Sequence, residues 1–99
     1  MLTIRELLNQ IKWDPKYSSQ KTHVMIQYTH RGVPKDYLII AFENLLEIHS
    51  DSFEYWNSAI QERIRIPFHR IEKIFNEQTN QILYIKRVTG ASTNGKESF

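Results

Sequence analysis

The sequence contains no cysteine and only three glycines in 99 residues. The absence of cysteine excludes disulfides, thiolate metal sites and cysteine nucleophiles. With so few glycines there is no glycine-rich loop of the kind that cradles phosphates in nucleotide-binding proteins. No apolar run approaches the roughly 18 residues that a membrane span requires. We therefore expect a cytoplasmic protein that has no membrane partner.

Metal-binding patterns are also lacking. The four histidines stand at positions 23, 30, 49 and 69, without the i, i+4 spacing or the cysteine pairs of zinc sites. No sequence signature of a nucleotide or other cofactor is present either. We expect neither a metal nor a cofactor.

The charge is small in total but unevenly spread along the chain. The net charge is +2. Residues 1–40 hold six Lys/Arg and three Asp/Glu, residues 41–62 hold five Asp/Glu and no Lys/Arg, and residues 63–99 hold seven Lys/Arg and three Asp/Glu. A basic face beside an acidic one would suit an anionic ligand, although a mixed, solvated surface is an equally good interpretation.

Hydrophobic periodicity predicts an α+β domain. An apolar i, i+3, i+4, i+7 pattern and a T-x-x-E capping box predict a helix over residues 3–11. Alternation and β-branched content predict antiparallel strands, and helical spacing predicts short helical turns in residues 42–46 and 68–75. The strands are expected in residues 23–30, 37–42, 53–56, 62–66 and 82–87. We therefore expect the N-terminal helix to pack on an antiparallel sheet of about four to five strands, in a single domain over residues 1–87 followed by a disordered tail, 88–99.

Two His-Arg pairs carry the clearest chemical signal. His30 and Arg31 precede Gly32, and His69 and Arg70 follow a proline that ends a predicted strand. Arginine presents a planar fork that matches phosphate oxygens, and histidine adds a further donor. Glycine allows a tight turn and the close approach of a ligand. If the two segments are neighbours, four donors would converge on one phosphate; otherwise they are exposed arginines beside partly buried histidines.

The sequence W-D-P at residues 13–15 ends the predicted helix. Trp13 could stack on a nucleobase, but a tryptophan just after an amphipathic helix more often anchors the helix end in the core. Asp14 could orient a histidine or an arginine, or could serve only as a turn residue.

Two further classes of function stay open from the residues alone. His30 and His69 could act as acid and base in a phosphodiesterase, although the H-x-T pairs of two-histidine phosphoesterases are absent. The acidic segment 41–62 could instead be the contact surface of a protein-interaction subunit in an RNA-processing complex.

Several segments together resemble one known family. W-D-P, the Y-x-H-R-G of residues 28–32 and the I-P-F-H-R-I of residues 66–71 occur in this order, followed by I-L-Y-I-K-R. This combination resembles a small, mostly archaeal family described as the RNA cyclic-group end recognition domain, over roughly residues 8–87. Phe68 stands where that family more usually has tyrosine, and the stretch S-F-E-Y-W-N-S-A-I-Q-E is longer than its usual turn.

The resemblance implies an RNA-binding module rather than an enzyme. Its implied ligand is a phosphorylated RNA end, in particular a 2′,3′-cyclic phosphate, and RNA-repair or RNA-processing enzymes are its implied partners. The phosphate would be bound by the two His-Arg pairs and Gly32, with three supporting residues around them: Trp13, Asp14 and Phe68. Oligomeric state and RNA sequence preference do not follow from the resemblance.

Overall fold

The computed structural model describes residues 3–86, so the predicted tail 88–99 lies outside the described part of the chain. This part begins with one α-helix, α1 (Ile4–Trp13), and contains four 3₁₀ helices and seven strands. The 3₁₀ helices are η1 (Pro15–Tyr17), η2 (Lys21–His23), η3 (Phe42–Asn44) and η4 (Phe68–Arg70). The strands are β1 (Val24–Thr29), β2 (Tyr37–Ala41), β3 (Leu45–Ile48), β4 (Ser52–Asn57), β5 (Glu62–Pro67), β6 (Ile71–Asn76) and β7 (Ile82–Ile85).

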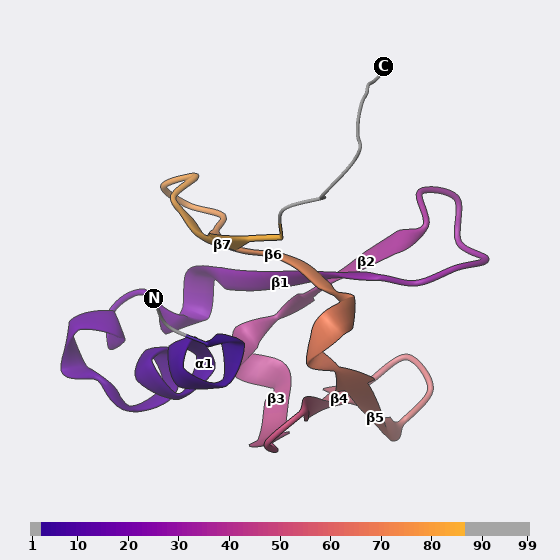
Figure 1. The fold of residues 1–99 in the computed structure, drawn as a ribbon, viewed down its shortest axis with the longest axis horizontal. Coiled ribbons are helices and arrows are strands. Elements are labelled where there is room, and N and C mark those ends of the chain that lie inside the picture. The colour runs from indigo at the N-terminus through magenta and orange to yellow at the C-terminus, as the bar shows by residue number, and fades with distance from the viewer. Residues whose placement is uncertain (1–2, 87–99) are drawn as a thin grey trace.

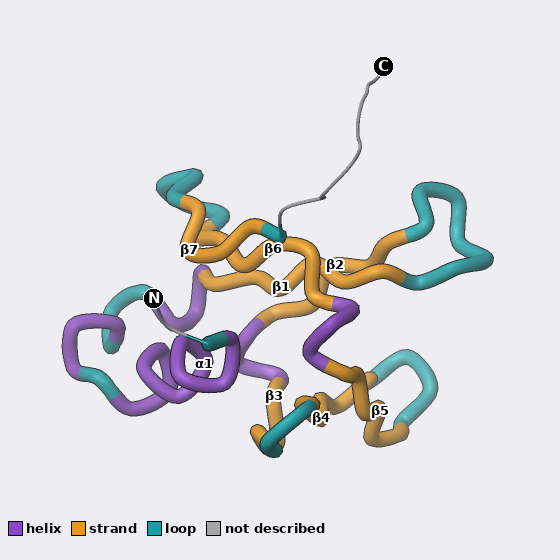
Figure 2. Tube along the Cα trace, viewed as in Figure 1, coloured by secondary structure: helices purple, strands orange, loops and turns teal. Residues whose placement is uncertain are grey.

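The strands form two antiparallel sheets. One has the order β2-β1-β6-β7 and the other the order β3-β4-β5. In Figure 1 the four-stranded sheet crosses the upper part of the molecule, while α1 and the three-stranded sheet lie below it. The tube in Figure 2 shows two short helical connections between the sheets, η3 from β2 to β3 and η4 from β5 to β6. The α+β class is confirmed, but the strands number seven in two sheets rather than four to five in one.

A single core joins the helix and both sheets. Its buried residues come from α1, from η3 and from strands of each sheet: Leu7, Leu8, Ile11, Val24, Ile26, Tyr28, Phe42, Phe53, Tyr55, Ile66, Ile71 and Ile74. Because one cluster of buried residues has members in α1 and in both sheets, we expect the two sheets and α1 to unfold together.

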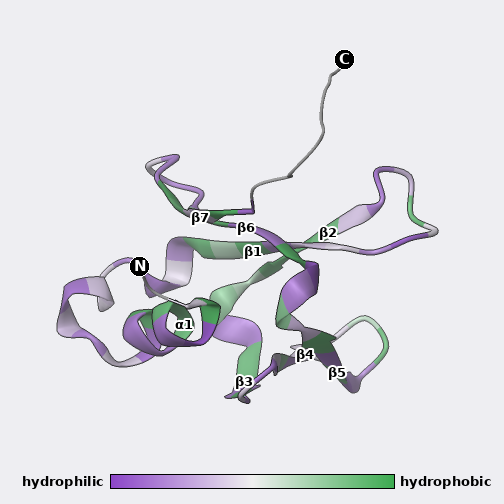
Figure 3. Cartoon of the chain, in the orientation of Figure 1, coloured by the Kyte–Doolittle hydropathy of each residue, from purple (hydrophilic) through white to green (hydrophobic). Residues whose placement is uncertain are grey.

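The helix α1 forms where its sequence predicts it. Thr3 Oγ1 accepts from the Glu6 backbone N–H at 3.1 Å, and the Glu6 carboxylate accepts from the Thr3 N–H at 2.8 Å. This capping box also holds the pKa of Glu6 below its ordinary value. Figure 3 shows hydrophobic and hydrophilic residues alternating around the turns of α1, as expected of a helix with one buried face. With ten residues, α1 is far from the length that would cross a bilayer, and no other helix of residues 3–86 is longer.

Two predicted helical turns were partly wrong. Residues 42–46 begin as η3 but continue as strand β3 from Leu45, and residues 68–75 begin as η4 but continue as β6 from Ile71. In the second case a β-bulge explains the error. Tyr28 of β1 pairs with Ile71 and Gln27 with Lys73, so one residue of β6 has no partner. An extra residue places buried Ile71 and Ile74 three positions apart on one face, which imitates helical spacing.

Candidate functional site

A small hollow of about 240 Å³ lies where β1 ends beside the junction of η4 and β6. Thr29, His30, Arg31 and Arg70 line it, and we call it the His-Arg hollow. The antiparallel pairing of β1 with β6 brings the end of one strand to the start of the other. Three of the four predicted donors, from both His-Arg pairs, therefore share one concave surface.

The β1–β2 loop positions the first His-Arg pair. The His30 N–H donates to the Asp36 carbonyl at 2.9 Å, and the Asp36 N–H donates to the Val33 carbonyl at 3.0 Å. Gly32 has a φ of +97°, in the region that favours glycine. A Cβ at Gly32 would meet no atom within 4 Å, so the need for glycine arises from the backbone conformation. Gly32 shapes the loop and does not itself line the hollow.

The β-bulge fixes the wall on the other side of the hollow. Glu72 is the unpaired residue of β6, and its carboxylate accepts from Thr29 Oγ1 at 2.9 Å and from Gln27 Nε2 at 3.0 Å. Because the Thr29 hydroxyl donates its proton to Glu72, only its lone pairs are left for a ligand. A carboxylate therefore stands directly behind one wall of a hollow that is otherwise lined by cationic and imidazole groups.

Tyr28 lies beneath the same hollow. Its ring is 1% exposed and meets the His30 ring edge-on, with centroids 6.2 Å apart. Its hydroxyl is hydrogen-bonded to the Tyr55 hydroxyl at 2.6 Å, which links the two sheets. Burial, followed by this hydrogen bond, raises the pKa of Tyr28, while the nearby Arg70 charge acts in the opposite direction. His30 thus packs against a buried aromatic ring, and Arg70 lines the same hollow as His30.

His69 does not join the other three donors. It lines a larger hollow of about 610 Å³ between the start of α1 and η4, which we call the α1–η4 hollow. Phe68, predicted as a supporting residue, lines that hollow too and packs against the core. A 3₁₀ helix has three residues per turn, so the side chains of consecutive residues point in different directions. The predicted convergence of four donors therefore needs correction to three, with His69 on the other side of η4.

Trp13 and Asp14 lie in a third place. They line a hollow of about 580 Å³ along α1, and Trp13 is 72% exposed. The interpretation of Trp13 as a core residue is wrong, because the indole lies outside the core. Asp14 accepts from the Lys16 backbone N–H at 3.0 Å and caps η1. Neither residue lines the His-Arg hollow, so the structure does not place them there as a wall or an orienting group.

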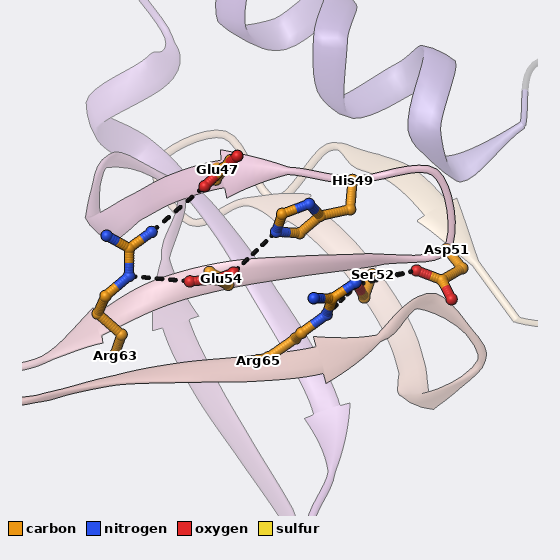
Figure 4. Close-up of polar contacts among 7 residues, drawn as sticks. All are labelled: Glu47, His49, Asp51, Ser52, Glu54, Arg63 and Arg65. Atoms are coloured by element: carbon orange, nitrogen blue, oxygen red, sulfur yellow. Dashed lines mark hydrogen bonds and ion pairs between the residues drawn. The ribbon is translucent and has the colours of Figure 1, made fainter.

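The three-stranded sheet holds the ion pairs of residues 3–86. Figure 4 shows Arg63 pointing toward Glu47 and Glu54, and Arg65 toward Asp51. The hydrogen bonds from His49 and Arg63 keep the pKa of Glu54 below its ordinary value. By contrast, Arg31 and Arg70 form no ion pair with any carboxylate of the described residues. The acidic segment is thus partly neutralised within its own sheet, while the cations of the His-Arg hollow are available to an anion.

One group on this sheet has the ligand types of a metal site. Ligand atoms of Glu47, His49 and Glu54 all lie within 4.8 Å of one another. However, Arg63 already donates to both carboxylates, at 3.3 and 2.8 Å, and His49 Nε2 is 2.8 Å from Glu54. The positive charge that a metal ion would supply is provided there by a guanidinium.

Sequence reasoning missed three residues that shape the His-Arg hollow. Thr29 and Tyr28 directly precede the first His-Arg pair, and Glu72 follows the second by two positions. The proximity of all three to the two pairs was the available signal. Their roles depend on the strand register and the bulge, which periodicity does not reveal.

The chain was compared with known protein families and with solved structures. Residues 1–87 match the model of a family described as the MJ1316 RNA cyclic group end recognition domain. A UPF0248 protein of Methanococcus vannielii is 43% identical over 83 residues, which covers 84% of this chain and 90% of that protein. The UPF0248 protein MJ1316 of Methanocaldococcus jannaschii is 32% identical over 84 residues, which covers 85% of this chain and 94% of that protein.

No solved structure matches the chain. The family model spans most of the sequence, including both His-Arg pairs and the bulge between β1 and β6. The similarity to the two archaeal proteins likewise extends over most of each chain. The protein therefore belongs to the MJ1316 RNA cyclic group end recognition domain family.

Proposed function

We propose that this protein binds the 3′ ends of RNA that carry a 2′,3′-cyclic phosphate, and that the His-Arg hollow holds the phosphate. The observation that carries the proposal is the meeting of Arg31, Arg70 and His30 in one small hollow without an ion-pair partner among residues 3–86. Guanidinium groups donate to phosphate oxygens in a fixed fork geometry, and such charge-assisted hydrogen bonds are the strong ones. The description of the family as an RNA cyclic group end recognition domain supports the same ligand.

The position of Glu72 favours the cyclic end over a linear one. A 2′,3′-cyclic phosphate carries one negative charge, whereas a terminal monophosphate carries about −1.5 to −2 at neutral pH. The Glu72 carboxylate lies behind Thr29 at 2.9 Å from its hydroxyl, and it would repel the additional charge. Charge attraction by the two arginines alone would favour the linear end, so discrimination rests on this carboxylate and on the small size of the hollow.

Binding without catalysis is the simpler role for this arrangement. Ring opening of a cyclic phosphate needs a base and an acid near the reacting atoms. His30 lines the His-Arg hollow, but His69 lines the α1–η4 hollow. The two imidazoles that would form an acid–base pair are therefore divided between two surfaces. In this proposal the protein acts in the cytoplasm, presenting RNA ends to repair or processing enzymes.

We expect RNA with a 2′,3′-cyclic end to bind and to remain unchanged. Incubation of the protein with such an RNA, followed by separation of cyclic and opened ends by electrophoresis, measures this directly. Binding followed in parallel by fluorescence anisotropy shows that the RNA was bound during the incubation. Ring opening that disappears in both His30→Ala and His69→Ala variants would contradict the proposal and favour the phosphodiesterase. Absence of binding to any RNA end would instead favour the protein-interaction subunit.

A further inference from the structure

Trp13 is an unusually exposed aromatic side chain. It ends α1 and is 72% exposed, the largest exposed fraction among the large hydrophobic residues of the described chain. The opposite face of α1 supplies Leu7, Leu8 and Ile11 to the core. An indole in this position contributes little to folding, which leaves it available for contact with another molecule.

Most of the residues around Trp13 are polar or charged. The hollow next to it is lined by Arg5, Glu6, Asn9, Gln10, Asp14 and Pro15, and Lys12 Nζ lies 5.2 Å from the centre of its ring. A protein-binding hot spot would need a well-packed, desolvated centre around the aromatic ring. An exposed ring with a lysine over it is instead typical of surfaces that stack bases of single-stranded nucleic acid.

The charges around Trp13 are available to an anionic strand. No carboxylate among residues 3–86 forms an ion pair with Arg5, Lys12 or Lys16. The two nearby carboxylates are engaged with backbone N–H groups, Glu6 at the start of α1 and Asp14 at the start of η1. Arg5, Lys12 and Lys16 stand against the carboxylates of Glu6 and Asp14, so the three cations outnumber the two anions by one. The cations that lack an ion pair can contact the phosphates of a phosphodiester backbone.

The hollow of Trp13 and the α1–η4 hollow adjoin each other. Arg5 and Glu6 line both the hollow of Trp13 and the α1–η4 hollow. The α1–η4 hollow is lined in turn by His69, the residue next to Arg70 of the His-Arg hollow. Arg5 and Trp13 are separated by roughly 12 Å along the helix axis, at about 1.5 Å per residue. This length exceeds one nucleotide, so a bound strand would have to be several nucleotides long.

We propose that single-stranded RNA whose 3′ end occupies the His-Arg hollow crosses η4, follows the exposed side of α1 and stacks one upstream base on Trp13. This inference rests on the proposed function for the RNA end, and adds to it a second, sequence-tolerant contact. His69, Arg5 and Lys12 contact the backbone of the strand along the way. The protein thereby recognises an RNA chain that continues beyond the end, and discriminates against free cyclic mononucleotides.

The two tryptophans of the chain allow a direct test. In a Trp56→Phe background, Trp13 is the sole tryptophan fluorophore. We expect an oligouridylate hexamer with a 2′,3′-cyclic end to quench its fluorescence, and uridine 2′,3′-cyclic phosphate to leave it unchanged. In the otherwise unaltered protein, Trp13→Ala should weaken hexamer binding by about 5- to 150-fold, the range that base–aromatic stacking gives. Its affinity for the mononucleotide should be unaffected, and Trp13→Phe should restore part of the hexamer affinity.

Trp56→Ala on β4 is the matched control, because Trp56 is exposed on the three-stranded sheet, away from α1. It should not change hexamer binding. Absence of quenching by a saturating hexamer, or an equal loss for hexamer and mononucleotide in Trp13→Ala, would overturn the proposal. A hexamer ending in a 3′-hydroxyl separates the two proposals: if it quenches Trp13 and binds as tightly as the cyclic form, the strand path holds and end recognition fails. If neither hexamer binds, both proposals fail.

Discussion

Arg70→Ala is expected to weaken the binding of RNA with a cyclic 3′ end by about 10- to 150-fold. Arg70 is the residue of the second His-Arg pair that lines the His-Arg hollow, together with His30 and Arg31 of the first pair. Hydrogen bonds to a charged group contribute about 1.5–3 kcal/mol, which corresponds to that range. Isothermal titration with a short cyclic-ended RNA measures the loss. The salt dependence should fall as well, by about 0.7 in the slope of log K against log salt for each lost phosphate contact.

Two other variants give this experiment its controls. Arg70→Lys keeps the charge but not the fork, so it should recover only part of the affinity. Arg63→Ala removes an exposed arginine of the three-stranded sheet that pairs with Glu47 and Glu54, and it should leave RNA binding unchanged. An equal loss in Arg63→Ala and Arg70→Ala would mean that overall charge, and not the His-Arg hollow, governs binding.

Phe53→Ala is expected to lower the free energy of unfolding by about 3–5 kcal/mol. Phe53 lies on β4, is fully buried, and packs its ring beside Tyr55 with centroids 6.3 Å apart. If the two sheets share one core, the cavity should destabilise the whole protein, in a single transition. A domain of this size has a total stability of roughly 5–15 kcal/mol, so much of it would be lost. Urea unfolding followed by far-ultraviolet circular dichroism measures the change.

Trp56→Ala on the same strand is the comparison for this prediction. Trp56 is 40% exposed, and we expect its removal to cost about 1 kcal/mol or less, because it leaves no buried cavity. Similar losses for the two variants would argue against a core that includes β4. Two separate unfolding transitions in Phe53→Ala would show that the three-stranded sheet folds independently.

The features that the sequence predicts well are those set by neighbouring residues. The capping box of Thr3 and Glu6 and the alternation in β1 and β5 are local patterns, and each appears in the structure as expected. The division into two sheets depends on pairing between distant strands, which hydrophobic periodicity does not encode. The bulge at Glu72 shows the limit clearly, because it gives a strand the apolar spacing of a helical turn.

The same distinction applies to the site. Residue types led to the prediction of His30, Arg31 and Arg70, because the chemistry of phosphate binding favours arginine and histidine, and the structure places the three in one hollow. The directions of the side chains could not be predicted from the sequence. His69 and Arg70 are consecutive in η4 but line different hollows. Trp13 shows the opposite error, since an expected core residue is exposed. Two adjacent residues in a sequence therefore need not line the same hollow.

Competition between two RNA ends measures whether the protein prefers the cyclic phosphate. Two RNAs of identical sequence, one ending in a 2′,3′-cyclic phosphate and one in a linear 3′-phosphate, compete for the protein at pH 7.5. We expect tighter binding of the cyclic end, by about fivefold or more, equivalent to roughly 1 kcal/mol. In Glu72→Gln this preference should shrink, because the carboxylate behind Thr29 that repels the second charge is gone. Equal affinity for the two ends in the unaltered protein, or a preference for the linear end, would contradict it.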